Sequence, residues 1–310
     1  MVIITMTRPA ELARLLVAIG EQERRPDCLI VVENGRDAAT AEVLRAHPMV
    51  QHLSNVGNLG GAGGFAYGIL AALAQGASSV WVMDDDGLPE DNRCLAELVA
   101  RAEKTSADIV SPLIVDINDS SKLSFPYYLG FKRLRCRRLV RAMPEIHGFA
   151  HLFNGALLSA DACRRFGVPD FRLFIRGDEV DFLNRVRRGG GQILTLTNVG
   201  FRHPSGSSET EPILGGYLNA VLPKGDLKQF YFFRNRGYIV REHRLVLQFC
   251  SDLVRYPAYF LLKKRGDWRG LLRWIRLTVR GFRGDFTPFD PIADSTTSMD
   301  RRTEPLSSIP

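Results

Sequence analysis

Val80-Trp81-Val82-Met83-Asp84-Asp85-Asp86 is the stretch of sequence that decides the fold. The apolar run predicts a buried β-strand, and this strand ends abruptly in three carboxylates. Adjacent acids cannot lie in an apolar core, because burying unpaired charge is very costly. They must face water, a cation or a cationic ligand at the C-terminal end of the strand, where open α/β sheets bind ligands. Such a cluster suits Mg²⁺ or Mn²⁺, and a solvated turn is the alternative for an acidic triplet taken alone.

The composition is that of a globular protein with an excess of positive charge. The 310 residues are 45% hydrophobic and carry a formal net charge of +7, which favours a phosphorylated substrate, an acidic membrane or nucleic acid as partner. Five scattered cysteines without a CxxC pair resemble neither a zinc site nor a disulfide framework and favour a reducing cytosol. The chain opens directly on a strand-like segment, and no run approaches the ~18 apolar residues of a membrane span.

Strands and helices alternate over the first 115 residues, which predicts a doubly wound α/β sheet. Strands are expected at 2–6, 28–32, 80–84 and 109–115, and residues 116–150 are expected to be irregular. A further strand at 153–158 contains Asn154-Gly155, which predicts a kink or the close approach of another group. The glycine-rich segment 55–64 precedes a helix of small residues. Its glycines could approach a phosphate at the helix N-terminus or simply allow tight helix packing.

A second acidic group, Gly177-Asp178-Glu179-Val180-Asp181, begins a helix predicted to continue to about residue 188. Helix N-termini favour acids on electrostatic grounds alone. Asp178 and Asp181 nevertheless share one face of the helix, with Glu179 turned away, and a carboxylate at the mouth of a pocket is a candidate general base. His203 follows a strand expected at 192–197 and could complete a metal site with the acidic triplet. His147 and His151 are interpreted as structural.

The C-terminal third combines aromatic and basic residues. Between 245 and 283, apolar residues fall at near-helical spacing at Trp268, Leu271, Leu272, Ile275 and Val279, among many Lys and Arg. A basic helix with such a face can lie on an anionic membrane, and docking on the catalytic domain or on another subunit is the alternative. Residues 287–310 are rich in Pro, Ser, Thr and Asp and are expected to be disordered.

Taken together, these motifs resemble family 2 glycosyltransferases of the GT-A fold, in the galactofuranosyltransferase-like and rhamnosyltransferase-like branch. The resemblance covers about residues 2–243. Besides the two acidic groups and His203, it depends on four segments: Thr5-Met6-Thr7-Arg8-Pro9, Glu33-Asn34-Gly35, Gly57 to Phe65, and Asn154-Gly155-Ala156. It implies a Rossmann-like, mostly parallel sheet flanked by helices at 1–243. A basic amphipathic helical region at 244–286 and a disordered tail at 287–310 would follow.

The resemblance also implies roles for individual residues. It assigns Asp84, Asp86 and His203 to an Mn²⁺ or Mg²⁺ ion that bridges the donor phosphates. Asp178 and Glu179 match the paired acids of galactofuranosyl relatives, in which the second acid is the base. In this sequence the second acid is a glutamate, and Gly177 replaces the tryptophan that usually precedes the pair. The remaining nucleotide-sugar contacts would be Thr5, Arg8, Glu33, Asn34, Asn58, Gly61, Asp84, Asp85, Asn154, Gly155 and Arg176.

The implied function is inverting, metal-dependent transfer of galactofuranose from UDP-galactofuranose to a cell-surface glycan or a polyprenyl-linked acceptor. A rhamnosyltransferase that uses dTDP-rhamnose and a non-catalytic nucleotide-sugar-binding scaffold are the alternatives. The expected location is cytoplasmic and peripheral, on an anionic membrane surface at the inner face of the cell membrane. A homo-oligomer is a further possibility. Nucleic acid is not expected as a partner, because no recognition motif accompanies the positive charge.

Overall fold

The computed structural model describes the chain except for residues 56, 130–131, 206–208, 293 and 295–310 and the side chains of 128, 129, 132 and 133. The predicted tail therefore lies mostly outside the described residues. The chain forms two compact units: Met1–Phe174 with Asp178–Ser207, and Ile175–Gly177 with Ser208–Pro310. The domain boundary expected at residue 243 falls inside the second unit.

The first unit is built on one large sheet with the strand order β3-β2-β1-β4-β10-β6-β11-β5. Strands β1 to β4 are parallel to one another, as are β6 and β11, whereas β10 runs antiparallel between β4 and β6. The predicted mostly parallel sheet is thus confirmed. The strands are β1 Val2–Thr5, β2 Leu29–Asn34, β3 Val50–Asn55, β4 Ser79–Asp84, β5 Leu88–Pro89, β6 Ile109–Asp116, β10 Asn154–Ser159 and β11 Ile193–His203.

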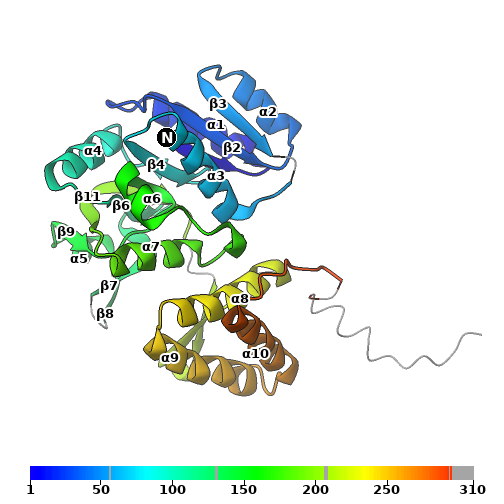
Figure 1. Cartoon of the computed structure of the whole chain (residues 1–310). Helices are drawn as coiled ribbons and strands as arrows, with labels where there is room; N and C mark the ends of the chain where they lie inside the picture. The colour runs from blue at the N-terminus through cyan, green and yellow to red at the C-terminus, as the bar shows by residue number, and fades with distance from the viewer. Residues whose placement is uncertain (56, 130–131, 206–208, 293, 295–310) are drawn as a thin grey trace, which may run out of the picture. The chain divides into compact units, whose positions relative to one another are not determined.

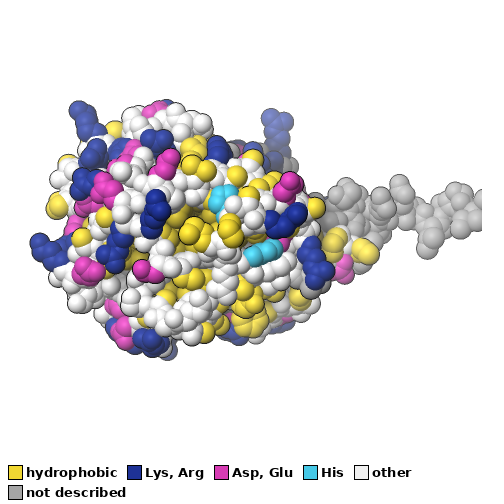
Figure 2. All heavy atoms as spheres, turned by 90° about the horizontal axis from the view of Figure 1, so that it is seen from above, with side chains coloured by type: hydrophobic (Ala, Val, Ile, Leu, Met, Phe, Trp, Pro, Cys, Tyr) yellow, Lys and Arg dark blue, Asp and Glu magenta, His cyan; other side chains and the backbone are white. Residues whose placement is uncertain are grey.

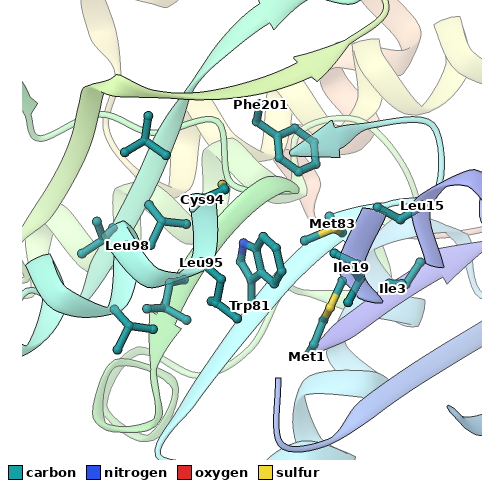
Figure 3. Packing of buried hydrophobic residues seen from close by; sticks show 14 of the residues in the cluster. Met1, Ile3, Leu15, Ile19, Trp81, Met83, Cys94, Leu95, Leu98 and Phe201 are labelled. Carbon is teal, nitrogen blue, oxygen red and sulfur yellow. The ribbon is translucent and has the colours of Figure 1, made fainter. Parts of the chain in front are cut away.

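Helices cover both faces of this sheet (Figure 1). Helices α1 Pro9–Gly20, α2 Ala38–Arg45 and α4 Cys94–Thr105 pack on one face, and α3 Gly60–Ala74, α6 Ala160–Phe166 and α7 Asp178–Arg188 pack on the other. Side chains of a strand alternate between faces, so Trp81 and Met83 of β4 join the first core while Val80 and Val82 join the second. Figure 3 shows Trp81 and Met83 among side chains of the first core. A short helical turn, η1 Phe171–Leu173, precedes α7.

The prediction that residues 116–150 are irregular is wrong. They contain β7 Lys122–Leu129, β8 Lys132–Cys136, α5 Arg137–Arg141 and β9 Glu145–His147. Strand β7 pairs with β6, and β9 pairs with β11. Pairing with strands from distant parts of the sequence stabilises these elements, and local sequence patterns do not reveal such pairing. Strand β11 likewise extends beyond the expected 192–197 to His203.

The second unit consists of a β-hairpin and packed helices. Its elements are β12 Thr210–Ile213, η3 Leu214–Gly216, β13 Leu218–Val221, α8 Asp226–Glu242, α9 Val246–Pro257, the π-helical η4 Ala258–Lys263 and α10 Trp268–Arg283. Two glycines let α8 and α10 pack closely. A Cβ at Gly281 would lie 1.8 Å from the Arg234 carbonyl oxygen, and one at Gly237 would lie 2.2 Å from that of Thr278.

No helix among the described residues is both long and apolar enough to cross a membrane. On the face seen in Figure 2, acidic and basic side chains are interspersed with apolar ones. The net positive charge is therefore not gathered into one continuous field on that face.

Candidate functional site

The acidic triplet lies where β4 ends, beside the end of β1, as the sequence predicts. Ile4 of β1 is in register with Asp84. Thr5 Oγ1 donates a hydrogen bond of 2.7 Å to Asp85 Oδ2. Arg8 Nη1 lies 2.6 Å from Asp86 Oδ2 and 3.1 Å from Asp85 Oδ1. Arg8, expected to contact the nucleotide, therefore serves as the cation for two of the three acids in this structure.

The three carboxyls differ in their ionisation. Burial, together with the charges of Asp86 and Asp85, raises the pKa of Asp84 well above its usual value. Burial also raises the pKa of Asp85 to about 6, although Arg8 and Thr5 oppose the shift. Burial would raise the pKa of Asp86 as well, but its contacts with His203 and Arg8 outweigh burial and hold the value at about 2. Asp86 is thus the acid that stays ionised at neutral pH without a further cation.

His203 meets Asp86 from the end of β11. Its Nε2 lies 3.3 Å from Asp86 Oδ1, and its Nδ1 lies 2.7 Å from the carbonyl oxygen of Pro204. Because a carbonyl can only accept, Nδ1 must carry a proton, which leaves Nε2 as the nitrogen that faces the acid. A backbone carbonyl that fixes the histidine tautomer in this way is a common feature of metal-ligating histidines.

Two residues that sequence reasoning missed support His203. Ser124 Oγ donates a 2.6 Å hydrogen bond to the His203 carbonyl oxygen. The ring of Phe125 packs between those of His203 and His151, with centroid distances of 5.1 and 4.9 Å. Both residues belong to β7, within the segment predicted to be irregular. Without the pairing of β7 with β6, nothing in the sequence places them near His203.

The donor set fits a hard divalent cation in chemistry, although it is only partly assembled. Within the described ranges, no group of three or more His, Cys, Asp and Glu side chains is placed to hold a metal ion. The structure does bring Asp86 and His203 together, and the buried Oδ1 atoms of Asp85 and Asp86 have no hydrogen-bond partner. Carboxylate oxygens and one imidazole suit Mn²⁺ or Mg²⁺, and a cation there would relieve the crowding of Asp84 to Asp86.

The predicted nucleotide contacts on β2 and before α3 organise the start of α3. Asn34 Nδ2 donates to the Gly60 carbonyl oxygen at 2.8 Å, and Asn58 Oδ1 accepts from Gly60 N at 2.8 Å. A Cβ at Gly64 would lie 2.7 Å from Ile4 Cδ1, so packing alone already requires a small residue there. Glu33 is buried, and its carboxylate contacts Asp37 N and His52 Nε2, each at 2.8 Å.

The second acidic group forms the first turn of α7. Asp178 and Asp181 are both buried, as the predicted shared face requires, and Asp181 Oδ2 accepts from Arg185 Nε at 3.0 Å. The place a Cβ would take at Gly61 is 3.9 Å from Asp178 Oδ2. The glycine-rich segment and the start of α7 are therefore neighbours, although they are far apart in the sequence.

Glu179 points away from that face and keeps 29% of its side chain exposed. Its Oε1 accepts a hydrogen bond from Leu152 N. Burial raises its pKa to about 7, with a smaller contribution from Asp178, while the Leu152 bond opposes the rise. A carboxyl with this pKa can accept a proton near neutral pH.

His151 lies next to Glu179 and was interpreted from the sequence as structural. Its Nδ1 is 3.9 Å from Glu179 Oε1, and its ring packs edge-on against those of Tyr127 and Phe149. Burial lowers its pKa to about 3, so the ring is neutral at physiological pH. The only hint in the sequence is its position three residues before Asn154-Gly155.

Asn154 and Gly155 open β10 beside the end of β4. The predicted kink is confirmed, because the pairing of β10 with β4 shifts register between Asn154 and Ala156. Gly155 has φ +83°, and a Cβ there would lie 2.6 Å from the Phe201 ring. Its carbonyl oxygen accepts a 2.8 Å hydrogen bond from Trp81 Nε1. Asn154 is buried, and its Oδ1 has no hydrogen-bond partner among the described residues.

Arg176 belongs to the second compact unit and is described within it. It has φ +67°, and its Nη2 lies 2.6 Å from Glu209 Oε1. Asn235 Nδ2, from α8, donates to the carbonyl oxygens of Ile175 and Arg176 at 2.9 and 2.7 Å. The segment that leads into α7 is thus held by side chains of the second unit.

Comparison with known proteins connects this site to glycosyl transfer. Residues 1–162 match the family described as Glycosyl transferase family 2. The chain is 43% identical over 291 residues to galactofuranosyltransferase GlfT1 of Mycobacterium tuberculosis H37Rv, covering 92% of this chain and 95% of the relative. It is 40% identical over 292 residues to GlfT1 of Mycolicibacterium smegmatis, with coverages of 92% and 96%.

Among solved structures, the mannosyltransferase PcManGT from Pyrobaculum calidifontis, in complex with GDP-Man and Mn²⁺, is similar in fold. The superposition has a TM-score of 0.51 at 14% identity and covers 97% of this chain and 77% of that one.

Proposed function

The chain belongs to glycosyl transferase family 2, and from that premise we propose that it is an inverting, metal-dependent galactofuranosyltransferase that uses UDP-galactofuranose. The observation that carries the proposal is identity of 40–43% over 92% of the chain to enzymes named galactofuranosyltransferase. An identity that extends over both compact units supports the same reaction class more strongly than a shared fold does.

Glu179 is the proposed base. In an inverting displacement, the base removes the proton of an acceptor hydroxyl while the oxygen attacks the anomeric carbon from the face opposite the nucleotide. Glu179 has the partial exposure and the raised pKa that this role requires. Asp178 is buried beside it, and its charge helps to raise the pKa of Glu179. We therefore assign Asp178 to tuning and positioning the base.

Asp84, Asp86 and His203 are the proposed holders of the divalent cation. A bound Mn²⁺ or Mg²⁺ would offset the charge that develops on the departing diphosphate. The close approach of His203 Nε2 to Asp86 Oδ1 and the raised pKa of Asp84 support this assignment. Arg8 would then be free to exchange its present carboxylate partners for donor phosphate oxygens, which it can bind bidentately.

The remaining nucleotide-sugar contacts are proposed at the ends of β1, β2, β4 and β10. Asn34 and Asn58 shape the start of α3, where helix N–H groups favour anions. Asn154 offers a buried, unsatisfied amide oxygen beside β4. Arg176 of the second unit is proposed to contact substrate. The alternatives of a dTDP-rhamnose donor and a non-catalytic scaffold remain testable by donor profiling.

The proposed acceptor is a polyprenyl-linked or cell-surface glycan. Such an acceptor would place the reaction on the cytoplasmic face of the cell membrane, and the enzyme would meet it there as a peripheral protein. The basic and aromatic composition of residues 244–286 supports this location.

Calorimetric titration with nucleotides tests the donor and metal assignments together. UDP and UDP-galactofuranose are expected to bind with Mn²⁺ present and to bind at least tenfold more weakly without it, whereas dTDP-rhamnose is expected to bind poorly. Tighter binding of dTDP-rhamnose would move the assignment to a rhamnosyltransferase. The absence of nucleotide binding with either metal would leave the scaffold as the better explanation.

A further inference from the structure

One whole face of α9 is apolar and exposed in the part of the chain that the structure describes. Val246, Leu247, Leu253 and Val254 are 64%, 87%, 49% and 59% exposed, and Cys250 lies between them. Their spacing of i, i+1, i+4, i+7 and i+8 is that of one side of a helix. Leu262 of η4, 60% exposed, follows next along the chain. A contiguous apolar surface of this kind marks an interaction site.

We propose that this α9 face inserts into the interfacial region of a membrane that contains anionic lipids. The proposal rests on the proposed function, because a polyprenyl-linked acceptor requires the enzyme to work at a membrane surface. An amphipathic helix that lies in the plane of the interface buries its apolar side among the acyl chains while basic residues contact the headgroups.

The opposite side of α9 is firmly packed within the second unit. Asp252 is buried and contacts Arg236 Nη2 at 2.9 Å and Arg255 Nε at 3.5 Å. The ring of Tyr256 stacks on that of Trp274 of α10, with centroids 5.2 Å apart. The helix is therefore held in one rotation about its axis, and the exposure of its apolar side is a property of the folded unit.

The charges near this face favour an anionic surface. Arg244, just before α9, and Lys264, Arg265 and Arg269, just after η4, are exposed. Acids of the same region already have partners within the unit. Besides Asp252, Asp267 accepts from Gly270 N at the start of α10, and Asp285 pairs with Arg280 Nε at 2.9 Å. The accessible charge around α9 is therefore mainly positive.

That charge pattern argues against a second copy as the occupant of the face. A two-fold interface places the same surface on both sides, so the basic residues of two copies would face one another. Anionic headgroups instead supply the opposite charge, worth about 1 kcal/mol per Lys or Arg near such a surface.

Helix α10 carries a similar exposed stripe in the same unit. Trp268, Leu272, Ile275 and Val279 are 40–62% exposed. These are four of the five residues of the apolar spacing recognised from the sequence. Arg269, Arg276 and Arg283 are exposed on the same helix. The stripe offers a separate comparison, because it can be altered without touching α9.

Sedimentation of the full chain with lipid vesicles tests the proposal. The double variant Leu247→Glu/Val254→Glu should bind vesicles of phosphatidylcholine and phosphatidylglycerol at least tenfold more weakly than the unaltered chain. Met49→Glu, at an 85% exposed apolar residue of the first unit, should bind unchanged. Vesicle binding by the double variant equal to that of the unaltered chain would overturn the proposal. So would a fall in molar mass in solution, which would identify the face as an interface between copies.

A gain-of-signal variant covers the case in which the double variant misfolds. The emission of Leu247→Trp should shift to the blue on addition of anionic vesicles and be quenched by brominated acyl chains, and no change in emission would contradict insertion. Transfer to a short, water-soluble acceptor should be unaffected by Leu247→Glu/Val254→Glu. If the unaltered chain shows no transfer but binds vesicles through α9, the proposed function fails and the membrane surface stands.

Discussion

Glu179 is the residue on which the proposed chemistry depends most. Its carboxyl is half-buried against Leu152 N and His151, and its pKa is raised to about 7. A base works only when ionised, so the ionised fraction, and with it kcat/KM, should fall tenfold per pH unit below about pH 7 and level off above it. A pH–rate profile measured with saturating metal checks this. A profile flat between pH 5.5 and 8 would contradict the assignment.

Replacement of Glu179 separates chemistry from folding. Glu179→Gln should lower kcat by about 10²–10⁴-fold, which is the range for loss of a general base. The fold should not suffer, because Gln Oε1 can still accept from Leu152 N. The raised pKa means that the folded state binds this proton more tightly than the unfolded chain does, so ionised Glu179 reduces stability as pH rises from about 4.5 to 7. The Tm of the variant at pH 8 should therefore equal or exceed that of the unaltered chain.

Asp86 should control the metal dependence. It is the acid whose pKa is held at about 2 by His203 and Arg8 despite its burial. Asp86→Asn should raise the Mn²⁺ concentration for half-maximal activity at least tenfold, because it removes a charged oxygen ligand. Asp27→Asn, at an exposed acid that precedes β2, is the matched control and should leave it unchanged. Equal metal dependence in both variants would remove Asp86 from the ion site.

At the scale of single elements, the segment before α7 is strained. Phe174, Arg176 and Gly177 have φ values of +62°, +67° and +102°. Such backbone explains why a tryptophan before the acidic pair, usual in relatives of the type that the sequence resembles, is absent here. A bulky side chain with φ near +100° would be costly, whereas glycine adopts this φ readily.

Gly177→Ala should therefore slow catalysis through the position of α7. A Cβ there would lie 2.7 Å from Ile239 Cδ1, besides the backbone strain, and a cost of about 1–3 kcal/mol is expected. The Tm should fall by several degrees, and kcat should fall while the KM for donor changes little. Gly190→Ala, at φ +75° with no atom within 4 Å of the added Cβ, is the control. It should lose stability and keep kcat. An equal loss of kcat in both variants would show a general effect of instability.

The sequence predicts elements well where the signal is local. The helix after Pro9 buries Leu12, Leu15, Leu16 and Ile19, as its periodicity predicts, and β4 ends at Asp84. It predicts poorly what depends on distant pairing. The antiparallel β10 inserted between β4 and β6 and the strand β7 that carries Ser124 and Phe125 have no local signature.

The same contrast holds within the site. Asp84 to Asp86, Asp178, Glu179 and His203 are visible as motifs, because charged residues at strand and helix ends are conspicuous. The place of His151 beside Glu179 depends on how β7 and β10 approach α7. In α10, the apolar spacing was recognised but only Leu271 is buried, while Trp268, Leu272, Ile275 and Val279 are exposed. The exposed face of α9 was not singled out, because an apolar helical spacing is the same whether that face is packed or solvated.

At the scale of the whole molecule, the two compact units should differ in their response to a packing defect. Gly281→Ala would place a Cβ 1.8 Å from the Arg234 carbonyl oxygen, so it should destabilise the α8–α10 pair, although Ala normally favours a helix by about 1 kcal/mol over Gly. Hydrogen exchange should then speed up in α8 and α10 and stay unchanged in β1 and β4.

A control and a contrary result define that test. Gly20→Ala, at the end of α1 with open space around the added Cβ, should leave exchange unchanged in both units. If Gly281→Ala accelerates exchange equally in β1, β4, α8 and α10, the two units unfold as one cooperative body, and the division of the chain has no energetic meaning.

Analysis of the transfer product tests the central claim most directly. The full chain would be incubated with UDP-galactofuranose, Mn²⁺ and a short polyprenyl-linked glycan acceptor, and the product would be examined by NMR. The account predicts one added galactofuranosyl residue whose anomeric configuration is opposite to that of the donor, with no product from dTDP-rhamnose. A product that retains the donor configuration, or transfer from dTDP-rhamnose alone, would contradict it.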